Sequence, residues 1–333
     1  MKRQKNRVLF GLAIVLIPIV AIFLSFFCGR YPVSPSQVFS VIFQGDKASP
    51  KDYTVIVFLR IPRAIAAAAT GAGLAASVVA YQGVFRNPLV NSGLLGVSSG
   101  AAFGAALSIV FFQGYALTNI SAFVFGIIAV ALSYTIASVY RSVPTIMLIL
   151  GGTIVSSVFS SLLTLLKFTA DTSDQLPAIV YWTMGSVSST EYKDLWALIP
   201  ISLGLLILAI CANRINLLSV GEKEAGTMGV NVRLSKMVII IAATLSTAGA
   251  VCLAGAVGWV GLIIPHIGRM VVGNDNKILL PVTISIGMTF MIFVDTISRS
   301  IATTEIPLGV LTSLIGAPFF VFLLKKSRGG GWT

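Results

Sequence analysis

The chain has 333 residues, of which 56% are hydrophobic and only 10% are charged, and its mean hydropathy is strongly positive. This composition excludes an ordinary soluble enzyme and is typical of a protein that crosses a membrane many times. The formal net charge is +12, but the basic residues lie between apolar runs and are not gathered on one polar segment. We therefore do not expect a nucleic acid partner.

The first apolar run, residues 8–28, follows a short stretch that contains four Lys and Arg residues. It is longer than the apolar part of a cleavable signal and lacks an Ala-x-Ala cleavage site. We therefore predict an uncleaved first span with the N-terminus in the cytoplasm. Residues 29–59 are polar and contain three prolines, and we expect them to form the longest external connection.

The second predicted span, residues 64–83, has twenty residues and no charge. This is about the length that an α-helix needs to cross roughly 30 Å of hydrocarbon. Thirteen of the twenty residues are Ala, Gly or Ser. Such small side chains suit a helix that other helices approach closely, so we predict that this span is the central helix of a bundle.

Eight more apolar runs complete an all-α membrane protein of about ten transmembrane helices, in a single domain over residues 1–333. The runs cover residues 93–113, 117–139, 144–168, 190–211, 237–257, 258–273, 278–298 and 306–324. Run 258–273 is short and contains Pro265, so a broken or tilted helix is an alternative there. With both termini in the cytoplasm, that side receives fifteen basic residues and three acids, a difference equal to the whole net charge of +12.

Two pairs of segments within the chain are similar to each other. Residues 60–73 are similar to residues 233–249, and residues 87–103 are similar to residues 306–320. In the predicted topology the members of each pair cross the membrane in opposite directions. We therefore expect an inverted repeat of spans 2–5 and 7–10, with a transport path near the interface between the repeats.

The polar segment 214–236 joins the sixth and seventh spans on the predicted cytoplasmic side. Its central part, residues 217–228, contains helix-forming residues, and Gly229 stands where a helix C-terminus often takes the left-handed conformation. A short exposed amphipathic helix of this kind predicts a docking element for a partner protein. A solvated linker is the alternative.

Three separated motifs resemble one family of transport proteins. The first comprises R-x-P-R at residues 60–63, Q-x-x-x-R-N-P-L at residues 82–89 and L-L-G-V-S-S-G-A at residues 94–101. The second is AGAVGWVGLIIPHIGR at residues 254–269, and the third combines E-x-P-x-G at residues 305–309 with I-G-A-P-F-F at residues 315–320. In this order they resemble the FecCD-type permeases of ATP-driven importers for iron-siderophores, haem and cobalamin, and the resemblance covers nearly the whole chain.

The resemblance implies a multi-pass permease of the bacterial inner membrane that moves an iron-siderophore, haem or cobalamin-type chelate inward. It also implies three kinds of partner: a second permease, expected to form a homodimer although a sister chain is the alternative, two ATP-binding-cassette ATPase subunits, and an extracytoplasmic substrate-binding protein. The chain contains no phosphate-binding loop motif. We therefore expect no enzymatic activity and no cofactor on this chain, with ATP and Mg bound by the partner ATPase.

The resemblance also implies a role for the polar segment 214–236. In the family, the matching segment inserts into a cleft on the ATPase subunit, and Glu224, Ala225 and Gly229 are similar to its E-A-A-x-x-x-G loop, although Gly226 replaces the second Ala. The residues that we expect to couple the permease to the ATPase are Leu217, Leu218, Gly221, Glu222, Glu224, Ala225, Met228 and Gly229.

Arg60, Arg63 and Arg299 lie at the predicted external ends of spans. In the family, matching arginines meet glutamates of the substrate-binding protein, and exposed charges of this kind govern register and encounter rate. The alternative is that they are interfacial residues whose charged ends reach the water. Asp295 lies four residues before Arg299, so a local ion pair would compete with docking there.

Two short internal turns, at residues 87–89 and 141–145, lie beside the expected path. Irregular backbone at membrane depth is tolerated only where it is buried in protein or faces a watery cavity, so both turns are candidates for an inner gate. The resemblance favours Asn87, Leu89 and Thr145 as gate residues. A plain turn is the alternative at both places.

The rival function from another class is an ion-coupled secondary transporter, which an inverted repeat would also suit. Such a carrier needs ionisable groups at mid-membrane, and Asp295 is nearly the only candidate. His266 is the single histidine, without a neighbouring Cys or carboxylate in the sequence, so we predict no metal site. The three cysteines lie in or beside apolar runs and are expected to be packing residues.

Overall fold

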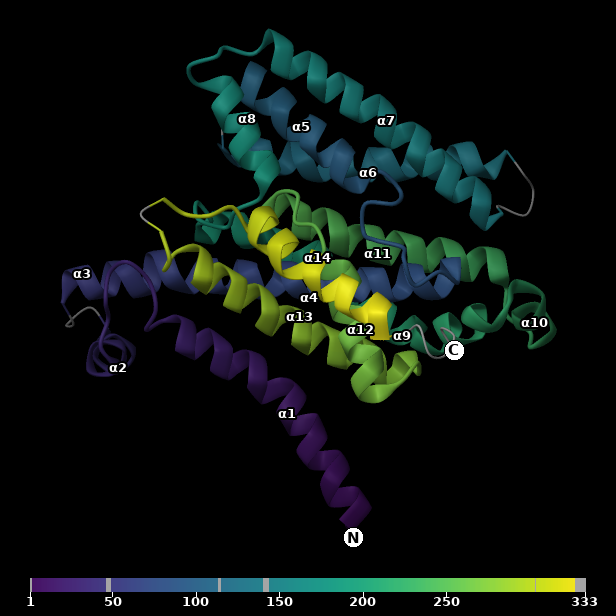
Figure 1. Ribbon diagram of the computed structural model, residues 1–333, viewed down its shortest axis with the longest axis horizontal. Coiled ribbons are helices and arrows are strands. Elements are labelled where there is room, and N and C mark those ends of the chain that lie inside the picture. Colours follow the sequence, from purple (N-terminus) through teal and green to yellow (C-terminus); the bar gives the residue numbers. More distant parts are fainter. Residues whose placement is uncertain (1, 46–48, 113–114, 140–143, 303, 327–333) are drawn as a thin grey trace.

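The computed structural model describes residues 2–45, 49–112, 115–139, 144–302 and 304–326. Within these ranges the regular secondary structure is helical (Figure 1). The α-helices are α1 (Lys2–Ser25), α2 (Pro35–Gln44), α3 (Pro50–Tyr53), α4 (Ile61–Phe85), α5 (Val97–Phe111), α6 (Tyr115–Ser138), α7 (Thr145–Thr169), α8 (Gln175–Met184), α9 (Leu198–Val220), α10 (Glu222–Thr227), α11 (Val232–Ala254), α12 (Val260–Val272), α13 (Asn276–Ser298) and α14 (Leu308–Lys326). A π-helical segment, Thr54–Arg60, joins α3 to α4, and a 3₁₀ helix, Tyr192–Ala197, precedes α9.

An apolar helix lies at each of the ten predicted positions, which confirms the all-α fold of a membrane protein. Among the described residues, six helical stretches are long and apolar enough to cross a membrane. Four further apolar helices are shorter: Leu9–Ser25, Val97–Phe111, Val260–Val272 and Leu308–Phe322. Pro265 lies inside one of these, α12, which begins directly after Trp259. The membrane boundaries of the spans stay predictions.

Helix α4 is the centre of the bundle, as its small residues predict. It packs against α9, α11, α12 and α13, and 89% of its most apolar stretch is buried. Its closest approach is to α13, where a Cβ atom added to Gly71 would lie 2.0 Å from the carbonyl oxygen of Gly287. The two backbones therefore touch, which only glycine permits at these positions.

Replacing Gly71 by Ala should destabilise the bundle by about 1–3 kcal/mol, because the added methyl group can be accommodated only by moving α4 away from α13. The measurement is the midpoint of thermal unfolding in detergent micelles. Gly11→Ala on α1 is the matched control, because a Cβ atom there would meet nothing within 4 Å. Equal midpoints for the two variants would show that the contact between α4 and α13 is looser than the structure has it.

The other helices form layers around this centre. Helices α5, α6 and α7 form a group that packs on α11 through α5 and α6, while α1 packs on α13 (Figure 1). Helices α4 and α11, which begin the two expected repeats, are the two most buried of the candidate spans, and they contact each other. The inverted repeat itself stays a prediction.

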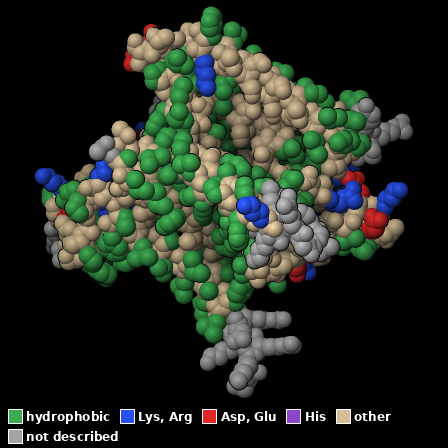
Figure 2. All heavy atoms as spheres, in the orientation of Figure 1, with side chains coloured by type: hydrophobic (Ala, Val, Ile, Leu, Met, Phe, Trp, Pro, Cys, Tyr) green, Lys and Arg blue, Asp and Glu red, His purple; other side chains and the backbone are tan. Residues whose placement is uncertain are grey.

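The two ends of the bundle carry the polar elements. Helices α2 and α3 lie at one end of the long axis, hereafter the α2 end, and α10 lies at the other, hereafter the α10 end (Figure 1). Figure 2 shows hydrophobic side chains over most of the viewed surface and charges of both signs gathered around α10. This distribution is expected of a bundle whose middle faces hydrocarbon and whose ends face water.

Residues 29–59 contain more helix than a polar connection was expected to have. Helix α2 begins with a capping box, in which the Ser34 side chain accepts a hydrogen bond from Gln37 N and the Gln37 side chain accepts one from Ser34 N. Tyr31 Oη donates to Asp52 Oδ1 at 2.9 Å, and this hydrogen bond raises the pKa of Tyr31 above its ordinary value. The predicted connection is therefore a folded unit on the α2 end.

Candidate functional site

The predicted coupling segment forms a ridge at the α10 end, which consists of α10 and the turn that follows it, residues 222–229. Helix α9 continues to Val220, so Leu217 and Leu218 belong to a span, and the expectation of one helix over residues 217–228 is wrong. Gly221 then breaks the chain direction before the short helix α10, Glu222–Thr227. The physical reason is the extended backbone of Gly221, which lets α10 leave the axis of α9.

The ridge has one buried side and one exposed side. Ala225 is fully buried and Leu218 almost so, whereas Glu224 is exposed and the Met228 side chain is 61% exposed. Gly229 follows with a φ of 80°, the left-handed conformation predicted for it, and Asn231 then caps α11. An exposed apolar methionine, held on a tight turn at the end of the charged helix α10, is suited to insertion into a groove of another protein.

Hydrogen bonds join the end of α9 to the start of α13 beside this ridge. Asn216 Nδ2 on α9 donates to Asp275 Oδ1 at 2.7 Å, and Asn216 Oδ1 accepts from the backbone N of Asn276 at 2.9 Å. The hydrogen bond from Asn216, aided by one from the backbone N of Lys277, lowers the pKa of Asp275 below its ordinary value. Asp275 is thus an ionised N-cap of α13, and the start of α13 is tied to the end of α9.

Two predicted sites meet behind the ridge. Glu222, predicted for coupling, accepts a hydrogen bond from the hydroxyl of Thr145, predicted for the gate, at 3.0 Å. Both contact Lys236 on α11, the last residue of the predicted segment 214–236, which was not among the residues expected to couple the permease to the ATPase. A basic residue near the start of a span is ordinarily interpreted as an interfacial anchor, so little in the sequence pattern indicates this contact.

The turn at residues 87–89 is firmly held. Asn87 Oδ1 accepts from Leu89 N at 2.9 Å, and Gln82 Nε2 donates to Pro88 O at 2.7 Å. Arg86 closes α4 in the left-handed conformation. The Leu89 side chain is 54% exposed, so it is free to face a path. Of the second turn, residues 141–143 lie outside the described residues, and Thr145 begins α7.

The three arginines at the α2 end are buried, which corrects the expectation of an exposed charge ring. Arg60, Arg63 and Arg299 are 5%, 8% and 7% exposed. Each has partners within the chain, because the loops at this end fold over them. Arg60 donates to the backbone oxygens of Phe26 and Tyr31. Docking of a partner on these arginines stays a prediction.

Arg63 is the centre of an ion-pair network. Its Nε donates to Asp295 Oδ1 at 2.8 Å, while Nη1 and Nη2 donate to the two carboxylate oxygens of Glu305 at 2.8 and 3.0 Å. Arg299 Nε lies 3.4 Å from Asp295 Oδ2, so the local pair at spacing i, i+4 is present, and Arg299 Nη2 also donates to Ser25 O. The network joins α1, α4, α13 and the loop before α14.

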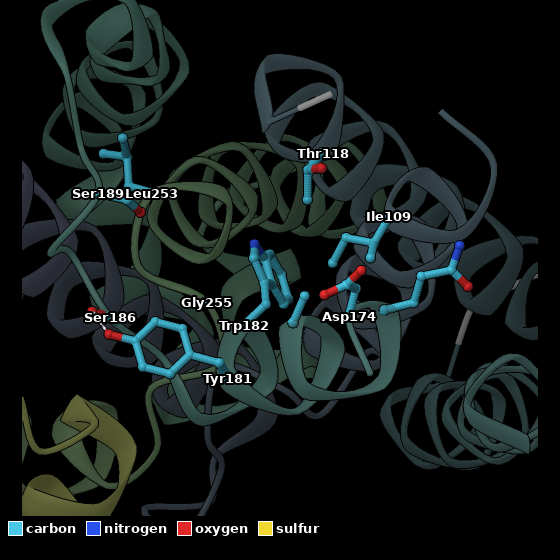
Figure 3. Close-up of a pocket in the computed structure, with 11 residues that line it drawn as sticks. Ile109, Thr118, Asp174, Tyr181, Trp182, Ser186, Ser189, Leu253 and Gly255 are labelled. Carbon is cyan, nitrogen blue, oxygen red and sulfur yellow. Dashed lines mark hydrogen bonds between the residues drawn. The ribbon is translucent and has the colours of Figure 1, made fainter. Parts of the chain in front are cut away.

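A cavity of about 570 Å³ lies beside α8, a helix that the sequence predictions missed (Figure 3). Its lining is mostly apolar, with the rings of Tyr181 and Trp182 from α8 and the Asp174 carboxylate near its start. Helix α8 has ten residues, too few for a span-length window to detect. In the part of the chain that the structure describes, no three His, Cys, Asp or Glu side chains are placed to hold a metal ion.

Comparison with known proteins shows the same architecture elsewhere. A family model described as the FecCD transport family matches residues 16–326. The molybdate import system permease MolB of Haemophilus influenzae is 41% identical over 98% of this chain and 97% of its own length. The cobalamin import system permease BtuC of Halobacterium salinarum is 38% identical over 83% of this chain and 75% of its own.

A solved structure extends the likeness to three dimensions. It is an inward-facing conformation assigned to a metal-chelate type ABC transporter, 40% identical in sequence. It superposes with a TM-score of 0.85 over 96% of this chain and 99% of that one.

Proposed function

The chain belongs to the FecCD transport family, and we propose that it is the permease subunit of an ATP-binding-cassette importer that brings a metal into the cell as a chelate or an oxyanion. It is a transport protein and not an enzyme, since ATP hydrolysis belongs to a partner ATPase in this family. ATP and Mg are accordingly bound by the ATPase and not by this chain.

The observation that carries this proposal is a polar face on α7. Helix α7 packs mainly against α5 and α6, and many of its residues are exposed. The exposed residues Thr153, Ser157, Ser160, Ser161 and Thr164 follow the helical period and form a hydroxyl stripe, which is flanked by exposed aliphatic residues such as Ile154, Val158 and Leu165. A stripe of this kind suits a watery path through protein, because lipid favours aliphatic side chains.

Helix α9 gives a comparison within the same chain. Between residues 198 and 212 its exposed residues are Ile199, Ser202, Leu203, Leu206, Ala209 and Ile210, which form a mostly aliphatic face suited to lipid. A hydroxyl stripe offers many weak hydrogen bonds and no fixed charge. A passage for a bulky or hydrated metal species needs this property, because strong binding at one point would stop transport.

The proposed assembly follows from the single stripe. One copy of the chain supplies one wall of a path, so a second copy would close it, and we propose a homodimer with the two α7 stripes facing a shared passage. Two ATPase subunits would bind the α10 ridges, and a substrate-binding protein would deliver cargo at the α2 end. The α10 end, and with it both termini, would then be cytoplasmic in a bacterial inner membrane.

The substrate is proposed at the level of a class. The sequence resemblance favours an iron-siderophore, haem or cobalamin, whereas the 41% identical relative carries molybdate. All of these are metals in an anionic or chelated form, which a hydroxyl-lined passage would admit without binding the metal itself.

Uptake in reconstituted vesicles tests this function. We expect the permease, incorporated with its ATPase and supplied with its binding protein, to accumulate one of radiolabelled molybdate, cobalamin, haem or ferric siderophore. Accumulation should require ATP and the binding protein, and unlabelled substrate of the same kind should compete. Uptake by this chain alone, driven by an ion gradient without ATP, would instead establish the secondary transporter.

A further inference from the structure

A buried lysine connects three helices at the α10 end. Lys236 lies in the second turn of α11, and its side chain is only 3% exposed. Its Nζ lies 2.5 Å from Glu222 Oε1 at the start of α10 and 3.3 Å from Thr145 Oγ1 at the start of α7. Thr145 Oγ1 also donates to the same oxygen of Glu222 at 3.0 Å, so the three side chains form a closed triangle.

This position is unfavourable for a lysine that has no ion-pair partner. Burying an ammonium group is costly, and a cation near the N-terminus of a helix is opposed by the helix dipole. The Glu222 carboxylate offsets both effects only while it stays within hydrogen-bond distance. The position of α10 relative to α11 is therefore set by this charge pair.

The triangle also reaches the helix that carries the hydroxyl stripe. Thr145 is the first residue of α7, directly after Pro144, and α7 continues without interruption to Thr169. A displacement of Glu222 would pull on the Thr145 hydroxyl and thus on the start of a straight helix of 25 residues. The hydrogen bond from Thr145 to Glu222 therefore joins α7 to α10.

We propose that Lys236 is a positioning residue that links the docking ridge to the path helix, so that a shift of α10 imposed by the ATPase is passed through Glu222 and Thr145 to α7. This inference rests on the proposed function, because it assigns to the ridge a partner that moves it. It goes beyond docking, since it names the side chains through which the docked helix acts on the path.

The test separates coupling from a structural role. In vesicles that contain the permease with its ATPase and binding protein, both ATP hydrolysis and substrate uptake are measured. Lys236→Met keeps the length of the side chain and removes the charge. We expect it to keep ATP hydrolysis and to lower the uptake per ATP by about fivefold or more, the lower end of typical couplings between sites.

A second variant keeps the test decisive if Lys236→Met does not assemble. Thr145→Val retains the shape of the side chain and leaves the charge pair intact, but it removes the hydroxyl through which α7 contacts Glu222. We expect the uptake per ATP to fall here too, and Thr145→Ser to restore it. Thr169→Val is the matched control, because the Thr169 hydroxyl at the far end of α7 bonds only to carbonyl oxygens of its own helix.

The outcomes distinguish the inference from the function on which it rests. If Thr145→Val and assembled Lys236→Met transport as much substrate per ATP as the wild type, the triangle is only structural and the inference is wrong. If the wild-type complex hydrolyses ATP but takes up none of the tested substrates, the proposed function fails and the inference falls with it. A loss of uptake per ATP in Thr145→Val, with the Thr169→Val control unchanged, supports both.

Discussion

Replacing Arg63 by Met should destabilise the folded bundle by about 3–5 kcal/mol, the range found when one partner of a buried ion pair is removed. Asp295 is only 2% exposed, and it would lose the 2.8 Å hydrogen bond from Arg63 Nε. Glu305, in the loop before α14, would lose both of its hydrogen bonds from Arg63. We expect a lower midpoint of thermal unfolding in detergent micelles and a lower amount of assembled protein in the membrane.

An exposed pair in the same chain is the control. Lys193 and Glu191 lie 2.9 Å apart, with side chains 55% and 64% exposed. Because water solvates the exposed Glu191 carboxylate after the change, Lys193→Met should alter the free energy of unfolding by about 0–1 kcal/mol. An Arg63→Met variant as stable as Lys193→Met would show that the network at the α2 end is open to water.

The network also affects how a substrate-binding protein could dock at the α2 end. The guanidinium of Arg63 already uses Nε, Nη1 and Nη2 on two internal carboxylates. A glutamate from a binding protein would therefore have to displace Glu305 from Arg63, which would remove one of the contacts of the loop before α14. Docking would then alter the permease instead of merely adding a charge contact.

The helices of this fold could be predicted because hydropathy is local. Runs of about twenty apolar residues mark the spans, and the small residues of α4 mark the centre, since both signals lie within one segment. Helix α8 was missed because ten residues are half a span. Helix α2 was missed although Ser34 and Gln37 have the spacing of a capping box, which a search for helix N-termini would have found.

The contacts between sites could not be predicted, because they join residues far apart in the chain. Arg63 pairs with Asp295 and Glu305, more than 200 residues later. The sequence is equally compatible with an exposed Arg63 and with a buried Arg63 that is paired. Lys236 is similar, because only the structure shows that Glu222 of α10 and Thr145 of α7 both contact this residue at a span end.

The turn after α10 gives the second large effect that we expect. Gly229→Val should lower ATP-driven uptake at least about tenfold, which corresponds to about 1.4 kcal/mol. The φ of Gly229 is 80°, and a β-branched residue held there costs of the order of 1–3 kcal/mol. The turn would relax to another conformation and move the ridge away from its docked position. The measurements are co-purification of the ATPase with the permease, and uptake in vesicles.

Two controls isolate the cause. Gly273→Val after α12 introduces the same residue at a φ of 79° with nothing within 4 Å, so it imposes left-handed backbone strain at the same end of the bundle but outside the ridge. Gly226→Ala adds a methyl group on α10 itself, also with open space around it and without a positive φ. Both should retain the ATPase and most of the uptake. If Gly273→Val loses uptake as fully as Gly229→Val, strain anywhere at this end is sufficient and the ridge has no special role. If Gly229→Val still binds the ATPase and transports normally, α10 does not depend on its turn and is not the coupling element.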